Sequence, residues 1–283
     1  MYKHYHLLES TREEMRKSSA ELLFFNKEKM GLNYDMFVNQ PNVLSNLINS
    51  WVTYAPGFSV KNGVHISLYG KAVHSLGTEK HKKYVERALN FEDVGCFGLT
   101  EILHGSNVRG ILTEAHYDHE NKEFIINSPS KEAMKFWIGA AANVANMSVI
   151  WAQLYIDGKC HGVHAYIVPI RDRRTHKLLP GVLVGDCGPK NGLNEIDNGF
   201  LLFDNVRIPK ANQLDRISGV DENGKFRTLI ENDDKRFGIQ LGPLSGGRFL
   251  IGMNAGINAL NALTIAIRYT CIRRQFSNKP GEK

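Results

Sequence analysis

The sequence predicts an α+β fold because its texture changes twice along the chain. Apolar residues recur at helical spacing near the N-terminus, short runs of β-branched and aromatic residues follow, and helical spacing returns near the C-terminus. With 283 residues, of which 42% are hydrophobic, the chain can bury one large core or two smaller ones. We therefore expect an N-terminal helical domain, a central β-barrel-like domain and the start of a C-terminal helical bundle.

The first predicted domain, residues 1–90, is helical. Its apolar residues fall into groups at helical spacing, and turn-forming breaks at 39–41 and 55–57 separate the groups. The groups include Leu22, Leu23 and Phe25, then Val43, Leu44, Leu47 and Trp51, then Val73, Leu76 and Tyr84.

The second predicted domain, residues 91–210, is a compact β domain. Runs rich in β-branched and aromatic residues alternate there with Gly, Asp and Asn turns. The runs lie at 123–126, 148–154, 164–170 and 199–203. Residues 211–242 are interpreted as a linker.

The last predicted segment, residues 243–283, contains the first helix of a C-terminal helical domain. It has at least one apolar face, and small residues between positions 255 and 266 would admit a close neighbour. A long amphipathic helix needs a bundle to bury it, yet the sequence ends about seven residues after the helical pattern does. We therefore expect a truncation here, with the partner helices downstream or in another subunit.

The charge pattern favours small anionic ligands over nucleic acid. The net charge of +6 arises from 35 Lys and Arg against 29 Asp and Glu, spread along the chain rather than gathered in one basic arm. No uninterrupted apolar stretch approaches the roughly 20 residues of a membrane-spanning helix, so we expect no membrane span. The four cysteines are far apart and form no CxxC pair, which favours a reducing, intracellular compartment.

Common catalytic and metal-binding motifs are absent from the sequence. It has no Walker loop, no GxSxG elbow, no HExxH pair and no GxGxxG turn between a strand and a helix. Close histidine pairs stand in polar or turn-like surroundings, without the carboxylates or cysteines that would complete a metal site, so we expect no metal. These pairs are His4/His6, His116/His119 and His161/His164.

Residues 96–107 are more informative, because a short apolar strand leads there into Thr100, Glu101 and a Gly-Ser-Asn turn. A hydroxyl and exposed backbone N–H groups suit the polar edge of a flavin ring or a phosphate. A capped turn would use the same residue types. Both interpretations stay open at this point.

The same stretch resembles the Thr-Glu-x-x-His-Gly-Ser/Thr signature of the acyl-CoA oxidases, which are part of the wider acyl-CoA dehydrogenase superfamily. Further motifs appear in family order, so the resemblance covers roughly residues 70–283. They lie at 115–118, 123–129, 135–139, 160–171, 179–186, 197–200, 206–209 and 269–276. The family generally has more helical sequence at both ends, so we expect a chain truncated at both ends.

The resemblance implies a flavoprotein. Acyl-CoA oxidases use FAD to oxidise a fatty acyl-CoA to the trans-2-enoyl-CoA and pass the electrons to O2, which yields hydrogen peroxide. By this resemblance Thr100 would bond to the flavin ring, Trp137 would lie against its face, and Gly139 would contact it through the backbone. Arg273 and Gln275 match a motif that reaches the FAD pyrophosphate across a dimer interface, with a helix-end Arg-Arg pair as the alternative.

Two further residues match the family's acyl-CoA site. Arg248 stands where the superfamily has an arginine that contacts CoA, and Ser106 matches a serine near the acyl-CoA entrance. An exposed arginine and a turn serine are the alternatives. The family's catalytic glutamate lies in the helical region that would follow Lys283, so no catalytic residue is assigned, although a proton α to a thioester needs such a base.

The residues after Gly139 depart from the family pattern. Oxidases commonly continue with glycines and a Lys-Thr or Lys-Ser pair, whereas this chain has alanines at 140–142, followed by Asn143-Val144-Ala145. The added methyl groups would crowd the flavin site, and the missing hydroxyl and charge would weaken it.

As a whole, the resemblance implies a peroxisomal, FAD-dependent acyl-CoA oxidase of fatty acid β-oxidation, acting as a homodimer on fatty acyl-CoA and O2, with this chain inactive alone. No targeting signal is visible. A dehydrogenase is the enzymatic alternative, although His104-Gly105 and residues 197–199 favour an oxidase. A catalytically impaired oxidase-like protein with a binding or regulatory role is the alternative from another class.

Overall fold

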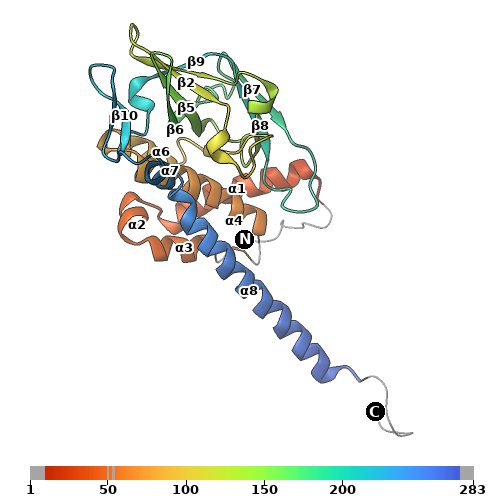
Figure 1. The fold of residues 1–283 in the computed structure, drawn as a ribbon. Helices are drawn as coiled ribbons and strands as arrows, with labels where there is room; N and C mark the ends of the chain where they lie inside the picture. The colour runs from red at the N-terminus through yellow and green to blue at the C-terminus, as the bar shows by residue number, and fades with distance from the viewer. Residues whose placement is uncertain (1–9, 50, 53–54, 275–283) are drawn as a thin grey trace. The chain divides into compact units, whose positions relative to one another are not determined.

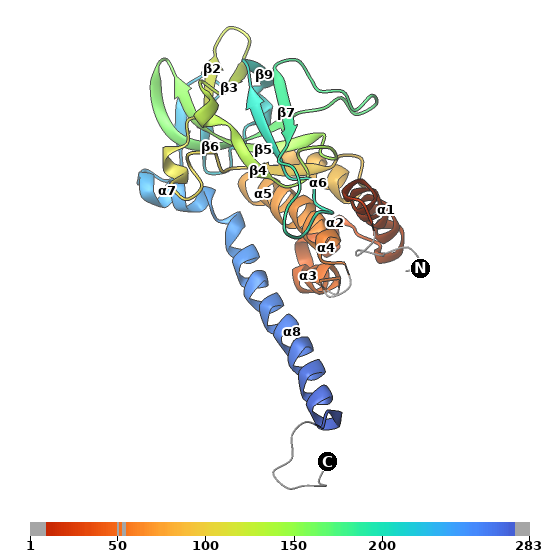
Figure 2. The same ribbon diagram turned by 90° about the vertical axis from the view of Figure 1, so that its right-hand side faces the viewer.

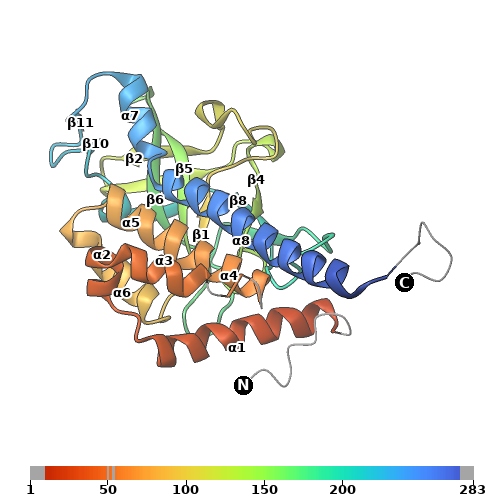
Figure 3. The same ribbon diagram turned by 90° about the horizontal axis from the view of Figure 1, so that it is seen from below.

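The computed structural model describes residues 10–49, 51–52 and 55–274, and the chain divides into two compact units, Met1–Leu244 and Ser245–Lys283. In the first unit, six helices gather at one end and the strands at the other (Figure 1). Seen from below, these helices lie in front of the strands (Figure 3). The segregation of helices from strands confirms the predicted α+β class.

The described part of the first unit contains seven α-helices, which are α1 (Arg12–Met30), α2 (Tyr34–Asn39), α3 (Pro41–Asn49), α4 (Pro56–Asn62), α5 (Lys71–Leu76), α6 (Lys82–Leu89) and α7 (Asp233–Gln240). Three of them begin at a residue whose side chain caps free N–H groups. Thr11 and Glu14 form a capping box on α1, which ends at Gly31 in the left-handed conformation. Asn33 and Asn232 cap α2 and α7 through their side-chain oxygens.

One continuous helical run, residues 56–76, passes through the helical layer. α4 leads directly into the π-helical segment η1 (Gly63–Gly70), and η1 leads into α5. Such π-helical insertions are uncommon and frequently lie at functional sites. η1 packs on strand β1 (Gly95–Gly98), where a Cβ added at Gly95 would overlap the buried ring of Tyr69. The absence of a side chain at Gly95 thus allows the helix to approach the sheet.

The strands form two sheets and a hairpin. Besides β1, they are β2 (Glu114–Asp118), β3 (Glu123–Asn127), β4 (Lys135–Ile138), β5 (Met147–Ile156), β6 (Lys159–Pro169), β7 (Val182–Asp186), β8 (Gly199–Phe203), β9 (Val206–Pro209), β10 (Ser218–Val220) and β11 (Phe226–Thr228). In the six-stranded sheet, β5 pairs parallel with β1 and β2 and antiparallel with β6, and β3 and β9 continue beyond β2. The second sheet has the order β4-β8-β7, and Figure 2 labels its outer strands β4 and β7.

Residues 211–242, interpreted from the sequence as a linker, contain regular structure. β10 and β11 pair as an antiparallel hairpin, and α7 follows them. Phe237 of α7 packs against the apolar core beside the helices.

Two buried cores lie on opposite faces of strand β5. Val149 and Trp151 belong to the core shared with the helices, whereas Ile150, Ala152 and Leu154 belong to the core between the two sheets. Successive side chains of a strand point to opposite faces, so a strand that is covered on both faces needs a continuous apolar run. The run at 148–154 that predicted a strand therefore marks the centre of the first unit.

Most of the second unit that the structure describes is one helix, α8 (Pro243–Ile272). Between Arg248 and Arg268 this helix has no charged residue, and its length and hydropathy are sufficient to cross a membrane. Length and composition by themselves do not establish a membrane span, and the core helix of a soluble protein can meet the same criterion.

Two buried histidines make the stability of the first unit depend on pH. The Nε2 atom of His65 lies 2.9 Å from the carbonyl oxygen of Ala88, and its Nδ1 accepts a hydrogen bond from the backbone N–H of Gly95. The Nε2 atom of His164 lies 2.8 Å from the hydroxyl of Ser218. Burial lowers the pKa of each histidine from 6.5 to about 4.

We expect the free energy of unfolding to fall as the pH falls from about 6.5 to about 4, because the unfolded chain binds protons there that the folded histidines do not. Between about pH 7 and pH 5 each histidine would account for roughly 2 kcal/mol. Urea unfolding at the two pH values measures the loss, and a His65→Gln variant should show a smaller one. Equal stability of the parent chain at both values would contradict the prediction.

Candidate functional site

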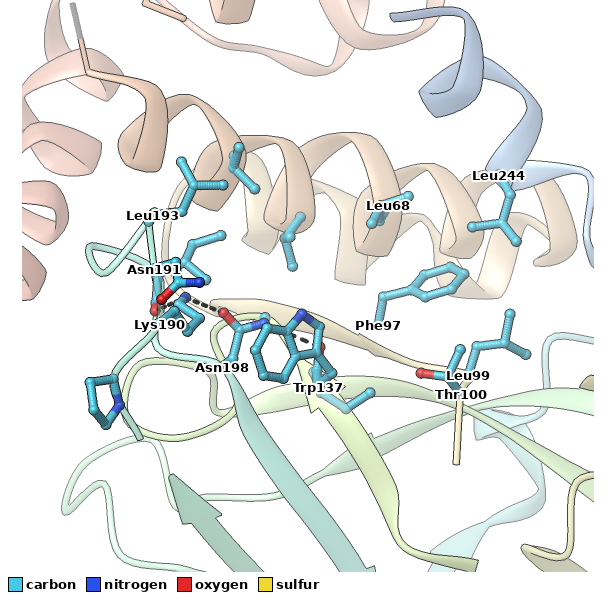
Figure 4. Close-up of a pocket in the computed structure, with 17 residues that line it drawn as sticks. Leu68, Phe97, Leu99, Thr100, Trp137, Lys190, Asn191, Leu193, Asn198 and Leu244 are labelled. Atoms are coloured by element: carbon cyan, nitrogen blue, oxygen red, sulfur yellow. Dashed lines mark hydrogen bonds between the residues drawn. The ribbon is translucent and has the colours of Figure 1, made fainter. Parts of the chain in front are cut away.

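A cavity of about 840 Å³ opens between the helical run 56–76 and the strands of the first unit (Figure 4). Its volume is in the range of about 300–1,000 Å³ that small-molecule sites occupy. The helical wall consists of Val60, Val64 and Leu68, and the strand wall of Phe97, Leu99, Thr100, Trp137, Ile138 and Gly139. A loop closes one side with Pro189, Lys190, Asn191, Gly192, Leu193, Ile196 and Asn198.

Three residues singled out from the sequence, Thr100, Trp137 and Gly139, lie together on the strand wall. The two segments that carry them are joined by two hydrogen bonds of 3.1 Å, from Thr100 Oγ1 to the Phe136 carbonyl and from the Phe136 N–H to the Thr100 carbonyl. Trp137 is 54% exposed. A Cβ added at Gly139 would lie 3.1 Å from Val64 Cγ2, so glycine preserves the gap between the two walls.

A fully buried ion pair lies directly behind this wall. Lys135 Nζ lies 3.1 Å from Glu101 Oε1, and neither side chain is exposed. Lys135 also donates to the carbonyl oxygens of Leu99 at 3.1 Å and Trp151 at 2.7 Å. The three N–H groups of the ammonium thus meet three oxygens, which is the condition under which a buried charge is tolerated.

The carboxylate of Glu101 is engaged at both oxygens. It accepts from the N–H and hydroxyl of Thr113 at 2.9 and 2.6 Å, from the Leu112 N–H at 2.7 Å, and contacts His104 Nδ1 at 2.9 Å. Burial raises the pKa of Glu101, but Lys135 and these hydrogen bonds together lower it by more than burial raises it. The pKa of Glu101 therefore lies below its ordinary value. Burial lowers the pKa of Lys135 to about 8, against the effect of Glu101.

The capped-turn interpretation of residues 96–107 describes Glu101, and the interpretation as a flavin or phosphate edge stays a prediction. Glu101 holds the turn, as in a capped structure, and has no free oxygen with which to abstract a proton. Its neighbour Thr100 faces the cavity and is available to a ligand.

The loop wall contains two polar residues whose role the sequence did not indicate. Lys190 Nζ donates to the carbonyl of Ile196 at 2.9 Å and to Asn198 Oδ1, and Asn198 Nδ2 donates to the carbonyl of Trp137 at 3.2 Å. Figure 4 shows this chain of contacts beside the Trp137 ring. Burial lowers the pKa of Lys190. The residues of the helical wall could have been found from their spacing, because Val60, Val64 and Leu68 recur every four positions on one helical face.

The other predicted site residues are not on the cavity walls of the first unit. Ser106 is exposed in the turn after Glu101, and its carbonyl accepts from the Val108 N–H. Arg248 and Arg273 are exposed residues of the second unit, and Gln275 lies outside the described residues. The histidines His4 and His6 are also outside the described part of the chain. Within that part, no group of three His, Cys, Asp or Glu side chains could hold a metal ion.

The alanines after Gly139 do not crowd the cavity. Ala140 and Ala141 are fully buried in the core between the two sheets. None of the three alanines at 140–142 is among the residues that line the cavity in the described structure. The methyl groups of Ala140 and Ala141 therefore fill the core between the two sheets, and Ala142 is half-buried outside the cavity lining. The expected weakening of the flavin site by the missing hydroxyl and charge stays a prediction.

Comparison with known proteins relates this arrangement to one family. The family described as "Acyl-CoA dehydrogenase, middle domain" matches residues 96–206. The chain is 44% identical to peroxisomal acyl-coenzyme A oxidase 3 of Arabidopsis thaliana over 225 residues, which cover 79% of this chain and 33% of that protein. It is 42% identical to human peroxisomal acyl-coenzyme A oxidase 3 over 250 residues, covering 88% of this chain and 36% of that protein.

Solved structures agree with the sequence comparison. The crystal structure of acyl-CoA oxidase 3 from Yarrowia lipolytica superposes with a TM-score of 0.86 at 33% identity, covering 97% of this chain and 38% of that one. Acyl-CoA oxidase-2 of Caenorhabditis elegans, bound with FAD, ascaroside-CoA and ATP, gives 0.83 at 30% identity, covering 96% and 40%. The chain thus spans about a third of the length of the curated relatives it matches.

Removing one partner of the buried ion pair should be strongly destabilising. We expect Glu101→Ala to lower the free energy of unfolding by about 3–5 kcal/mol, because the Lys135 ammonium then stays buried without its counterion. The double variant Glu101→Ala/Lys135→Met should regain part of this loss. Urea unfolding measures both, with the exposed Glu120→Ala as the matched control. A Glu101→Ala variant as stable as that control would show that the pair is not needed.

Proposed function

Because the chain belongs to the acyl-CoA oxidase family, we propose that it takes part in the oxidation of fatty acyl-CoA to trans-2-enoyl-CoA, with O2 reduced to hydrogen peroxide. The observation that carries this proposal is the cavity that gathers Thr100, Trp137 and Gly139 on one wall. By the same kinship we propose peroxisomal fatty acid β-oxidation as its setting.

The strand wall fits a flavin ring. Trp137 offers an exposed aromatic face, Gly139 offers a backbone edge without a side chain, and the surroundings are mainly apolar. The hydroxyl hydrogen of Thr100 is donated to the Phe136 carbonyl, which leaves the oxygen lone pairs of Thr100 to accept from an N–H of the ligand. We therefore propose that these three residues hold the ring of FAD. Bound FAD would supply the two-electron redox chemistry.

Four further residues are proposed to bind ligands on the ground of family resemblance alone. Ser106 and Arg248 would contact acyl-CoA. Arg273 and Gln275 would reach the FAD pyrophosphate of a partner subunit in a homodimer, since guanidinium groups bind phosphate oxygens in pairs. No Asp or Glu lines the described cavity, and Glu101 is engaged, so we propose no proton-abstracting base among the described residues.

Flavin binding and peroxide release test the proposal together. Purified protein should take up FAD, with visible flavin absorbance after removal of free cofactor. When acyl-CoA is then added under air to the FAD-loaded, full-length protein, hydrogen peroxide should be released. Flavin bleaching without peroxide would instead indicate a dehydrogenase. A colourless protein that binds acyl-CoA would indicate a binding or regulatory role, and either result would overturn the proposed oxidase.

Replacing the exposed tryptophan should weaken FAD binding with little effect on the fold. We expect Trp137→Ala to raise the FAD dissociation constant by about tenfold or more, because the aromatic face of the site is lost. The unfolding midpoint should stay near that of the parent, since the side chain is 54% exposed. Flavin fluorescence titration measures the affinity.

The matched control for this substitution is Leu229→Ala, which removes an apolar side chain that is 72% exposed and lies outside the cavity lining. Its FAD affinity should equal that of the parent. If Trp137→Ala binds FAD as tightly as Leu229→Ala, Trp137 is not part of the flavin site.

A further inference from the structure

Residues 137–144 form a backbone turn that carries Trp137 and Gly139 of the strand wall. The three residues Asp197, Asn198 and Gly199 all contact this turn. Asp197 contacts the C-terminal end of this turn. Its Oδ2 accepts from the N–H groups of Asn143 at 2.8 Å and Val144 at 2.9 Å, and its carbonyl accepts from the N–H of Ala142 at 3.3 Å. Three successive N–H groups that no strand partner reaches are thus satisfied by one residue.

Asn198 contacts the N-terminal end of the same turn. Its Nδ2 donates to the Trp137 carbonyl at 3.2 Å, and its Oδ1 accepts from Lys190 Nζ. An ammonium group can only donate, so Lys190 fixes which end of the amide faces Trp137. Trp137 has a φ of 65°, a left-handed conformation that costs a non-glycine residue about 1–3 kcal/mol unless its surroundings hold it. The Asn198 contact supplies such a restraint.

Gly199 allows this approach of the two segments. A Cβ added there would lie 2.6 Å from the nitrogen and 2.9 Å from the Cα of Ala142, which no real side chain tolerates. The glycine is therefore required by close contact between two backbones rather than by its own dihedral angles.

A second buried ion pair connects these contacts to the helical wall. Lys61 Nζ lies 3.6 Å from Asp197 Oδ1, neither side chain is exposed, and Lys61 also donates to the Ser19 hydroxyl at 2.7 Å. Lys61 follows Val60, which lines the cavity from α4. The pair therefore ties the helical wall to the turn that carries the strand wall.

We propose that Asp197, Asn198, Gly199 and Lys190 form a clasp that positions Trp137 and Gly139 for the cofactor. They are positioning residues that act through the turn 137–144, and the Asp-Asn-Gly motif serves this turn rather than the chemistry. The proposal deepens the proposed flavin site and rests on it. Its first test requires no flavin, so failure of one can be separated from failure of the other.

The first test observes Trp137 directly, by fluorine NMR of the full chain labelled with 5-fluorotryptophan. The chain has three tryptophans, so Trp51 and Trp151 serve as internal controls, and Trp137→Phe assigns the third resonance. Asn198→Asp keeps the shape and the Lys190 contact but loses the donor to the Trp137 carbonyl. We expect the Trp137 resonance alone to shift. Lys190→Met should give the same selective shift if Asn198→Asp fails to fold.

The second test measures FAD affinity. Asn198→Asp should raise the FAD dissociation constant by about tenfold, the effect of losing one hydrogen bond of roughly 1.4 kcal/mol. The control is Asn223→Ala, an exposed residue in the turn between β10 and β11, which should match the parent in both tests. A Trp137 resonance that does not move, or that moves only together with those of Trp51 and Trp151, overturns the clasp. A parent chain that binds no FAD overturns the flavin site instead.

Discussion

The rest of the site depends on the buried ion pair between Glu101 and Lys135. It joins the end of β1 to the start of β4, and both partners are completely removed from water. Such a pair persists only when every donor and acceptor is satisfied, and here backbone carbonyls and N–H groups complete both ends. Since Thr100 precedes Glu101 and Trp137 follows Lys135 by two positions, this one pair brings both onto the same cavity wall.

The pair of Lys61 and Asp197 is a second buried ion pair beside the cavity, with Lys61 Nζ 3.6 Å from Asp197 Oδ1, an oxygen that has no hydrogen-bond partner among the described residues. In proteins generally, replacing a buried ion pair by apolar side chains of similar volume is often neutral for stability, so buried charges are weak evidence of stabilisation. Their contribution is directional, because a carboxylate that must meet particular N–H groups cannot slide along the turn. An arrangement of this kind suits a cavity in which two walls from separate elements keep a fixed separation, as at Gly139, where an added Cβ would lie 3.1 Å from Val64 Cγ2.

The order of the elements could be predicted from the sequence, because periodicity is a local property. Apolar residues at helical spacing predicted the helical region that contains α1–α6. The continuous apolar run at 148–154 predicted the strand β5, which both cores share. The hairpin and helix within 211–242 were missed, since strands of three residues each leave too short a pattern to recognise. The parallel pairing of β5 with β1 and β2 was equally beyond the sequence, because register depends on partners far along the chain.

For the site, the sequence by itself determined the residue types and, through family motifs, predicted that Thr100, Trp137 and Gly139 share one site; the structure places them on one cavity wall. Only the tertiary structure decided what their neighbours do. It buried the methyl groups of Ala140 and Ala141 in the core between the two sheets, and it directed the oxygens of Glu101 to Lys135 and to backbone N–H groups rather than to a substrate. The physical reason is that the direction of a side chain and the partner it meets are set by packing between distant segments, which spacing along the chain does not encode.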